Sequence, residues 1–298
     1  MKAVVYERYG PPEVLELREI DKPVPKNNEV LVKIFATTVT AGDWRMRKAD
    51  PFLARLFNGL FKPRKVKILG FEVAGVVEET GKNVEAFRKG DHIFASCGFR
   101  FGGYAEYTCL PVNDQIAIKP TNMTFEEAAA VPIGGLTALR LLNAAHRGPN
   151  EKVLIYGASG SVGTFAIQIA KAFDAHVTTV CSTGNVNLCR ELGADEVIDY
   201  RLTDFTKTPN QFDVILDAVG KISKSISRPL LMPGGRYVTV SGSPKAGKND
   251  LLELKTLIES GKLRTVIDRR YTLEQIREAH AYVESFRKKG NVVVNIVP

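Results

Sequence analysis

The sequence predicts an α/β protein with two domains, a small β-barrel built from both ends of the chain and a doubly wound parallel sheet between them. Two observations predict this fold class. Short strands separated by Pro, Gly and Asn turns fill the first part of the chain and return near its end. From residue 152 onward, strands alternate with helices, which is typical of a parallel sheet. The expected boundaries are 1–121 with 265–298 for the barrel and 122–264 for the parallel sheet.

The barrel part is expected to begin with short strands joined by tight turns. A basic, apolar insert over residues 50–67 is expected to form helix and loop. Thr272 and Gln275 form a capping box for a helix that reaches about Ser285. The expected strands of this part are Met1–Tyr6, Glu29–Phe35, Val73–Glu78, His92–Ala95, Ala105–Cys109, Gln115–Ile118 and, at the end, Val292–Val297.

The middle of the chain begins with two helices. Thr124 is a candidate N-cap for the first, and the second is expected over Pro132–Ala145. The strands of the parallel sheet are expected at 152–156, 176–181, 196–199, 213–218 and 236–241.

The most informative stretch is Lys152–Phe173, KVLIYGASGSVGTFAIQIAKAF. An apolar strand is followed by Gly157, Gly160 and Gly163 and then by an amphipathic helix. The first glycine turns the chain, the second lets a pyrophosphate approach the backbone, and the third lets the helix pack on the strand. A plain strand–helix turn would leave the glycine spacing unexplained. The pattern therefore predicts a dinucleotide site at the positive end of the helix.

Composition bounds the remaining possibilities. The hydrophobic fraction of 44% and charged fraction of 25% are those of a soluble globular protein. No signal peptide or transmembrane segment is expected, and four cysteines without C-x-x-C pairs favour a reducing, cytoplasmic location. The formal net charge of +8 suits an anionic cofactor. The alternative, nucleic acid or acidic lipid, is not favoured because the sequence has no long Lys/Arg block and no aromatic-interleaved basic motif.

Several blocks together resemble one family, in the right order and over nearly the whole chain. They are MKAVVYERYGPPEVLEL, LGFEVAGVVEETGKNVEAFRKGDHIF, FGGYAEY, AAAVPIGGLTAL, VLIYGASGSVG, LGADEVIDY, FDVILDAVG and PGGRYVTVSG. The chain resembles the medium-chain dehydrogenase/reductase superfamily, in its zinc-independent, NADPH:quinone reductase-like branch. The resemblance implies a GroES-like catalytic domain, a Rossmann domain, and hydride transfer from NADPH to a small-molecule quinone or α,β-unsaturated carbonyl.

The resemblance also bears on zinc. Thr40 stands where zinc-dependent relatives have their first catalytic ligand, and Phe71 stands where they have a histidine. Neither side chain can replace a thiolate or an imidazole on zinc, so no metal is expected. Without a Lewis acid, quinones and enones are the substrates that accept hydride readily.

The cofactor residues combine the glycine motif with positions carried over from the resemblance. The strand that would carry an acidic residue in an NAD site ends instead in Ser182, followed by Gly184 and Asn185. This favours NADPH, although NADH stays possible because relatives often have Lys or Arg after the serine. Tyr200 could be a plain strand-end tyrosine, and Lys289 and Asn291 could be solvated surface. The expected cofactor-binding residues are Gly157, Ser159, Gly160, Ser161, Val162, Gly163, Ser182, Tyr200, Val219, Gly220, Ser241, Gly242 and Asn291.

The catalytic candidates are Thr40, Asp43, Tyr104 and Thr137. Hydride transfer needs positioning and a dry cleft more than it needs an acid or a base. Asp43 could equally brace its loop, and Tyr104 could be structural. The four histidines have no partner that the sequence reveals.

One segment departs from the family pattern. After VSGS, relatives have a further helix and strand, whereas here Ser243–Asn249 leads straight to Asp250. Either this is a true deletion, or a disordered stretch is missing from the sequence. A deletion would expose the sheet edge where relatives pair, so a homodimer is possible but questioned. Two functions follow as hypotheses. One is the NADPH-dependent oxidoreductase, and the other is an NADPH-binding sensor or a basic RNA- or membrane-surface-binding protein without turnover.

Overall fold

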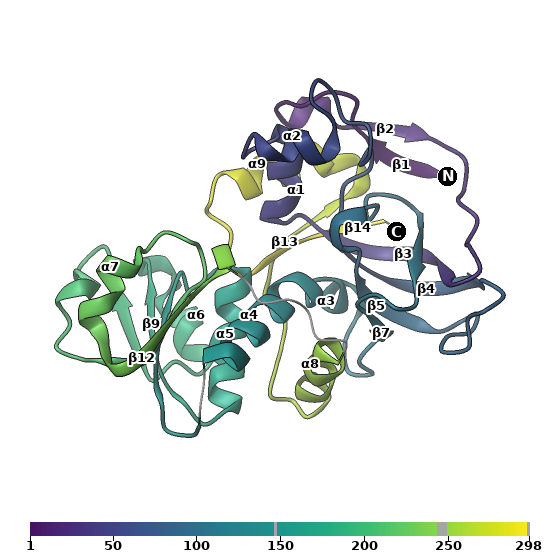
Figure 1. The fold of residues 1–298 in the computed structure, drawn as a ribbon. Coiled ribbons are helices and arrows are strands. Elements are labelled where there is room, and N and C mark those ends of the chain that lie inside the picture. Colours follow the sequence, from purple (N-terminus) through teal and green to yellow (C-terminus); the bar gives the residue numbers. More distant parts are fainter. Residues whose placement is uncertain (146–147, 243–248, 297–298) are drawn as a thin grey trace. The chain divides into compact units, whose positions relative to one another are not determined.

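The computed structural model describes residues 1–145, 148–242 and 249–296 (Figure 1). It contains two compact units. The first is Met1–Ile133 with Ile267–Pro298, and the second is Gly134–Val266. The domain boundaries drawn from the sequence, 121/122 and 264/265, stay predictions. Among the described residues, no helix has both the length and the apolar character needed to cross a bilayer, and the four cysteines form no disulfide.

The first unit is built on a mostly antiparallel sheet with the order β13-β14-β3-β4-β5-β7, with β6 also pairing β3. A separate ribbon joins β1 to β2. This arrangement is the GroES-like part of the expected fold. The bounds of its strands are β1 Lys2–Val5, β2 Glu16–Glu19, β3 Glu29–Thr38, β4 Glu72–Thr80, β5 His92–Ser96, β6 Tyr107–Pro111, β7 Ile116–Ile118, β13 Ile267–Thr272 and β14 Asn291–Asn295.

The central strand β3 joins the two ends of the chain. Its first half pairs with β6 and its last residues pair with β14, antiparallel in both cases. Val30, Val32 and Ile34 are completely buried in one core cluster, because alternate side chains of a strand face the same side. The C-terminal strand is therefore an internal part of this sheet.

Two helices of the first unit begin at side-chain caps. Thr40 and Asp43 form a capping box for α1 (Ala41–Lys48), and Thr124 and Glu127 form one for α3 (Phe125–Ala129). The predicted capping box at Thr272 is confirmed and precedes α9 (Ile276–Glu284). The predicted helix in the insert is α2 (Leu53–Asn58).

The second unit contains a parallel five-stranded sheet with the order β10-β9-β8-β11-β12. This is the predicted Rossmann sheet. Its helices are α4 (Pro132–Ala145), which starts at the unit boundary, α5 (Ser161–Ala172), α6 (Val186–Glu191), α7 (Lys224–Ser227) and α8 (Asp250–Glu259). Its strands are β8 Lys152–Tyr156, β9 His176–Cys181, β10 Glu196–Asp199, β11 Phe212–Asp217 and β12 Leu231–Thr239.

Some element bounds differ from the prediction. Strand β12 begins five residues earlier than expected, because Pro233-Gly234-Gly235 lies within the strand at a register shift rather than forming a turn before it. It also ends earlier, so Ser241 and Gly242 lie in a 3-10 turn. Strand β6 is shifted by two residues toward the C-terminus. Strands β2 and β13 were not predicted because their exposed or half-exposed side chains show no alternation.

The segment that is short relative to the family, Ser243–Asn249, lies outside the described residues except for Asn249. Among the described residues, β12 is the outermost strand, with β11 as its only partner. An extra edge strand in relatives, and the pairing of two copies there, stay predictions.

Candidate functional site

The glycine turn of the second unit has the geometry of a phosphate-binding corner. Strand β8 ends at Tyr156, Gly157 has φ +75°, and α5 begins at Ser161 with Gly160 as its N-cap. Within the part of the chain that the structure describes, no side chain caps this helix end. The amide end of α5 and the positive end of its dipole therefore suit an anion.

Two of the glycines have different roles. A Cβ at Gly163 would lie 2.4 Å from the Gly157 carbonyl oxygen, so any side chain there would push the helix off the strand. At Gly160, the nearest atom to a Cβ would be 3.6 Å away, so the space beside it is open. Gly163 is needed for packing, whereas an open Gly160 is what close approach by a pyrophosphate requires.

The end of β9 is linked to this corner by a side chain that the sequence analysis did not select. The Asn185 amide donates to Ser159 Oγ at 2.9 Å and to Ser182 Oγ at 3.1 Å. Ser182 and Asn185 are half-buried, and the last residue of the neighbouring strand, Asp199, pairs in register with Cys181. These polar groups could hold the adenosine ribose and a 2′-phosphate. A small polar residue three positions after the strand-end serine is the local signal that could have revealed Asn185.

The loop after β11 is held by a buried carboxylate that the sequence analysis also missed. Asp217 Oδ1 accepts hydrogen bonds from the N–H groups of Val219 (3.0 Å) and Gly220 (2.9 Å), and Oδ2 accepts one from Ile222 at 2.9 Å. Asp217 is completely buried, whereas Val219 and Gly220 are exposed. The loop is therefore fixed from below by Asp217, while Val219 and Gly220 stay exposed. An acid at the end of a buried apolar strand was the available signal.

The other predicted cofactor residues divide between the units. Tyr200 is 48% exposed, and its N–H donates to the Cys181 carbonyl at the end of β9. A Cβ at Gly220 would lie 2.8 Å from Ser241 Oγ, so these two loops lie side by side. Asn291 is buried in the first unit, and exposed Lys289 donates its N–H to Asp268.

In the first unit, Asp43 braces the start of α1. Asp43 Oδ2 accepts from the N–H of Thr40 (2.8 Å) and from its hydroxyl (2.6 Å), and Oδ1 accepts from the N–H of Gly70 at 2.8 Å. The side chain is completely buried. Burial raises the pKa of Asp43 to about 6, and the hydrogen bonds from Thr40, Gly70 and Tyr104 oppose that rise. Of the two roles considered for Asp43, the geometry favours the brace.

A chain of buried side chains continues from Asp43. The Tyr104 hydroxyl is hydrogen-bonded to Asp43 and lies 3.1 Å from His280 Nε2. His280 Nδ1 lies 2.9 Å from Arg47 Nη1, and Arg47 Nη2 is paired with Glu284. Tyr104, His280 and Arg47 are completely buried. We call Asp43, Tyr104, His280, Arg47 and Glu284 the buried polar network.

The donors and acceptors of the network fix one direction. Arg47 can only donate, so His280 Nδ1 accepts, Nε2 carries the proton, and Tyr104 in turn donates to Asp43. Burial, and then the Arg47 charge, lower the pKa of His280 well below its ordinary value, which agrees with a neutral imidazole. His280 thus has a structural partner at each nitrogen, although neither is near it in sequence.

Glu72 is a second buried acid that the sequence analysis overlooked. Its carboxylate accepts from the Thr38 hydroxyl and, at 2.6 Å, from the Ile133 N–H. Burial raises its pKa to about 7, and Asp43 adds to the rise while Lys288 opposes it. It follows Phe71 directly in the G-F-E block, where its polarity within a buried strand was the available signal.

The position compared with a zinc-binding histidine is filled by packed rings. The Phe71 ring centroid lies 4.1 Å from that of Phe101 and 6.1 Å from that of Phe99. The Thr40 hydroxyl is bonded to Asp43. Among the described residues, no group of three or more His, Cys, Asp or Glu side chains could hold a metal ion. These residues do not fit a catalytic zinc.

The catalytic candidates differ in exposure. Thr40 and Thr137 are half-buried, whereas Asp43 and Tyr104 are enclosed. Only the two threonines therefore have side chains that a bound molecule could reach in their own unit.

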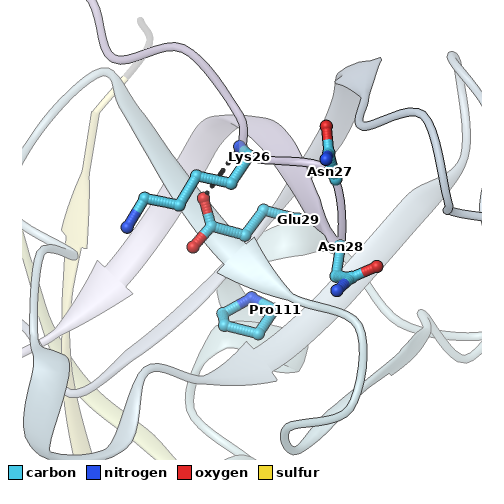
Figure 2. A pocket seen from close by; sticks show the side chains of 5 residues that line it. All are labelled: Lys26, Asn27, Asn28, Glu29 and Pro111. Atoms are coloured by element: carbon cyan, nitrogen blue, oxygen red, sulfur yellow. Dashed lines mark hydrogen bonds between the residues drawn. The ribbon is translucent and has the colours of Figure 1, made fainter.

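A surface pocket lies elsewhere in the first unit, between the turn before β3 and the end of β6 (Figure 2). Its lining residues are Lys26, Asn27, Asn28, Glu29 and Pro111. The Lys26 N–H donates to the Glu29 carboxylate at 3.0 Å. Glu29 begins β3 and Thr40 follows its other end, Thr38, so the strand separates them by roughly 30 Å at the usual rise per residue. The pocket is thus not the predicted site.

Two family models match the chain. "Alcohol dehydrogenase GroES-like domain" matches residues 26–120, and "Zinc-binding dehydrogenase" matches residues 161–292. The chain is 32% identical to the 2-methylene-furan-3-one reductase of Solanum lycopersicum, over all of this chain and 80% of the relative. It is 31% identical to the chloroplastic NADPH-dependent alkenal/one oxidoreductase of Arabidopsis thaliana, with the same coverage.

A solved structure of an oxidoreductase has the same fold over the whole chain. The quinone oxidoreductase from Coxiella burnetii superposes with a TM-score of 0.87 at 29% identity, over 100% of this chain and 99% of that chain. The alignment with the Solanum lycopersicum reductase spans 319 positions, whereas this chain has 298 residues. That relative therefore has residues without a counterpart here.

Proposed function

Because the chain belongs to the medium-chain dehydrogenase/reductase superfamily, in its quinone oxidoreductase branch, we propose that it is a zinc-independent, NADPH-preferring reductase of quinones or α,β-unsaturated carbonyls. It is an enzyme, an oxidoreductase that uses a nicotinamide cofactor. The cofactor preference, the independence of zinc and the substrate class are the parts that we propose. The names of the quinone and alkenal/one relatives support the substrate class.

The observation that carries the proposal is the corner at Gly160. Its open side, the uncapped start of α5 and the Ser159–Asn185–Ser182 hydrogen bonds together suit a dinucleotide with a 2′-phosphate. When bound, the cofactor supplies the hydride. Backbone N–H groups of α5 would hold its pyrophosphate, and the loop fixed by Asp217 would face its nicotinamide end.

The first unit supplies positioning. We assign substrate contact in this unit to Thr40, because its side chain is partly exposed. Thr137, which lies in the second unit, stays a predicted catalytic residue. Asp43 accepts a hydrogen bond from the Thr40 hydroxyl and so orients it, and Tyr104 in turn donates a hydrogen bond to Asp43. Asp43 and Tyr104 are thus positioning residues rather than groups that touch the substrate. The packed Phe71 ring and the bonded Thr40 hydroxyl support turnover without zinc.

The test compares cofactors on the full chain. We expect NADPH to raise the melting temperature more than NADH at equal concentration, because binding to the native state stabilises it. We also expect NADPH oxidation with a water-soluble quinone and with an enone, unchanged by a strong chelator. Equal or better turnover with NADH, or loss of activity on chelation, would contradict the proposal. Stabilisation without turnover on either substrate would favour the cofactor-binding sensor instead.

A further inference from the structure

The surface around α2 is apolar to a degree that folding does not explain. Phe61 is 85% exposed, Phe99 is 71% exposed, and Leu53 and Leu56 are each 67% exposed. Large apolar side chains gathered on one surface usually mark a binding site. Phe57, on α2, links the exposed residues of this helix to Phe99, because the two ring centroids are 5.8 Å apart. The apolar–basic surface is defined here as residues 52–67 together with Phe99 (near α2 in Figure 1).

The loop that presents Leu60 and Phe61 is fixed from beneath. Asn58 is buried, donates to the Tyr6 hydroxyl at 2.8 Å and accepts from the Val66 N–H at 2.6 Å. The Tyr9 hydroxyl donates to the Gly59 carbonyl at 2.7 Å. Because the backbone is already ordered, burying the outer side chains would cost little further conformational entropy.

The charge of this surface has one sign. Between Phe52 and Lys67 the sequence has five basic residues and no acidic one. Lys62, Arg64, Lys65 and Lys67 are exposed and directly follow Phe61. Apolar side chains next to several cations suit a surface that offers hydrocarbon beneath anions.

The charge pattern also favours one class of binding partner over the others. A second copy of this chain would bring two positive surfaces together, which is unfavourable. Nucleic acid would leave the leucines without partners, because bases stack on aromatic rings rather than on branched aliphatic groups. An anionic bilayer satisfies both components, since Leu60 and Phe61 reach the acyl region while the cations remain among the headgroups.

We propose that the apolar–basic surface docks the protein on anionic lipid bilayers, with Leu60 and Phe61 inserted and the basic run Lys62–Lys67 at the headgroups. This interaction goes beyond the proposed reductase activity and does not depend on it. It is peripheral and reversible, because a few side chains and a few charges supply it.

The experiment is co-sedimentation of the full chain with vesicles of phosphatidylcholine alone or mixed equally with phosphatidylglycerol. We expect binding to the mixed vesicles only, weakening as salt is raised. The double variant Leu60→Ser/Phe61→Ser should bind at least about tenfold more weakly, since each inserted side chain contributes more than a tenfold change when fully buried. The variant Leu202→Ser, at an 80% exposed leucine of the second unit, should bind like the native chain.

The contribution of charge is tested with two double variants that change the net charge by the same amount. Lys62→Glu/Arg64→Glu should lose binding, whereas Lys82→Glu/Lys89→Glu, at exposed lysines outside the surface, should retain most of it. Equal loss in both pairs would overturn the docking site, because only net charge would matter. Absence of binding to mixed vesicles, binding unaffected by the Leu60/Phe61 variant, or a preference for a polynucleotide over the vesicles would overturn it as well.

Discussion

The cofactor corner of the second unit and the buried polar network of the first consist of different chemical groups. The corner uses backbone N–H groups, an absent side chain at Gly160 and short polar side chains. The network uses charged and aromatic side chains that are fully enclosed except for the partly exposed Glu284, and each satisfies the next. A site of the first kind is robust because the fold itself makes it. A network of the second kind depends on every member, since an unpaired buried polar group is costly.

The largest effect is expected from breaking the network at Arg47. Arg47→Met removes the donor to the Gly10 carbonyl, to His280 and to Glu284 at once. We expect the free energy of unfolding to fall by about 3–5 kcal/mol, the range for removing one partner of a buried ion pair. Chemical denaturation measures this. Arg88→Met, at a 91% exposed side chain, should change it by no more than about 0.5 kcal/mol. A loss below about 1 kcal/mol at Arg47 would show that the network is dispensable.

The buried acids of the first unit should make stability depend on pH. The pKa of Glu72 is raised from 4.5 to about 7, so the folded chain binds more protons than the unfolded chain between these values. The free energy of unfolding therefore falls as the pH rises through this window, by roughly 3–4 kcal/mol for this group at about 1.4 kcal/mol per pH unit. Asp43, with its pKa raised from 3.8 to about 6, acts in the same direction at lower pH.

Glu72→Gln sharpens this expectation. A glutamine can still accept from the Ile133 N–H, but it does not titrate, so most of the fall between pH 4.5 and 7 should disappear. Denaturation at several pH values measures the slope. Glu85→Gln, on the surface, should leave the slope as it is in the native chain. An unchanged slope in Glu72→Gln would mean that this carboxyl is not the group that titrates.

The glycine pair tests the second unit. Gly163→Ala should destabilise the fold by about 1–3 kcal/mol, because the added methyl group meets fixed backbone atoms at 2.4–2.6 Å. Gly160→Ala should fold normally, yet weaken NADPH at least about tenfold, because its methyl group points into the space needed by the pyrophosphate. Melting curves with and without NADPH separate the two effects. Gly148→Ala, with open space around it, is the control and should change neither stability nor NADPH affinity. Normal NADPH affinity in Gly160→Ala would contradict the phosphate-binding role of the corner.

The smallest effect is expected at Asn185. Asn185→Ala releases the Ser159 and Ser182 hydroxyls that it now joins. We expect NADPH affinity to fall about fivefold, the value of one hydrogen bond, with NADH affinity nearly unchanged. Fluorescence titration with both cofactors measures the ratio of NADPH affinity to NADH affinity. Asn187→Ala, on the exposed side of α6, is the matched control. An equal loss for both cofactors would place Asn185 away from the 2′-phosphate.

The comparison also explains what the sequence could predict. The corner was readable because strand, glycines and amphipathic helix are consecutive and each has a local pattern. Even α1 had a local signal, the T-x-x-D capping box from Thr40 to Asp43, although no helix was predicted there. The network was not readable, because Tyr104, His280 and Arg47 are far apart in the chain and meet only after the sheet has formed.

The placement of β14 beside β3 has a consequence for synthesis of the chain. The last residues of β3 hydrogen-bond to a strand that the ribosome adds only after the whole second unit has been translated, because Thr38 pairs with Val293. The second unit, whose strands lie within one continuous segment, can complete its sheet earlier. Until translation reaches β14, the end of β3 stays an unpaired strand edge, which favours aggregation.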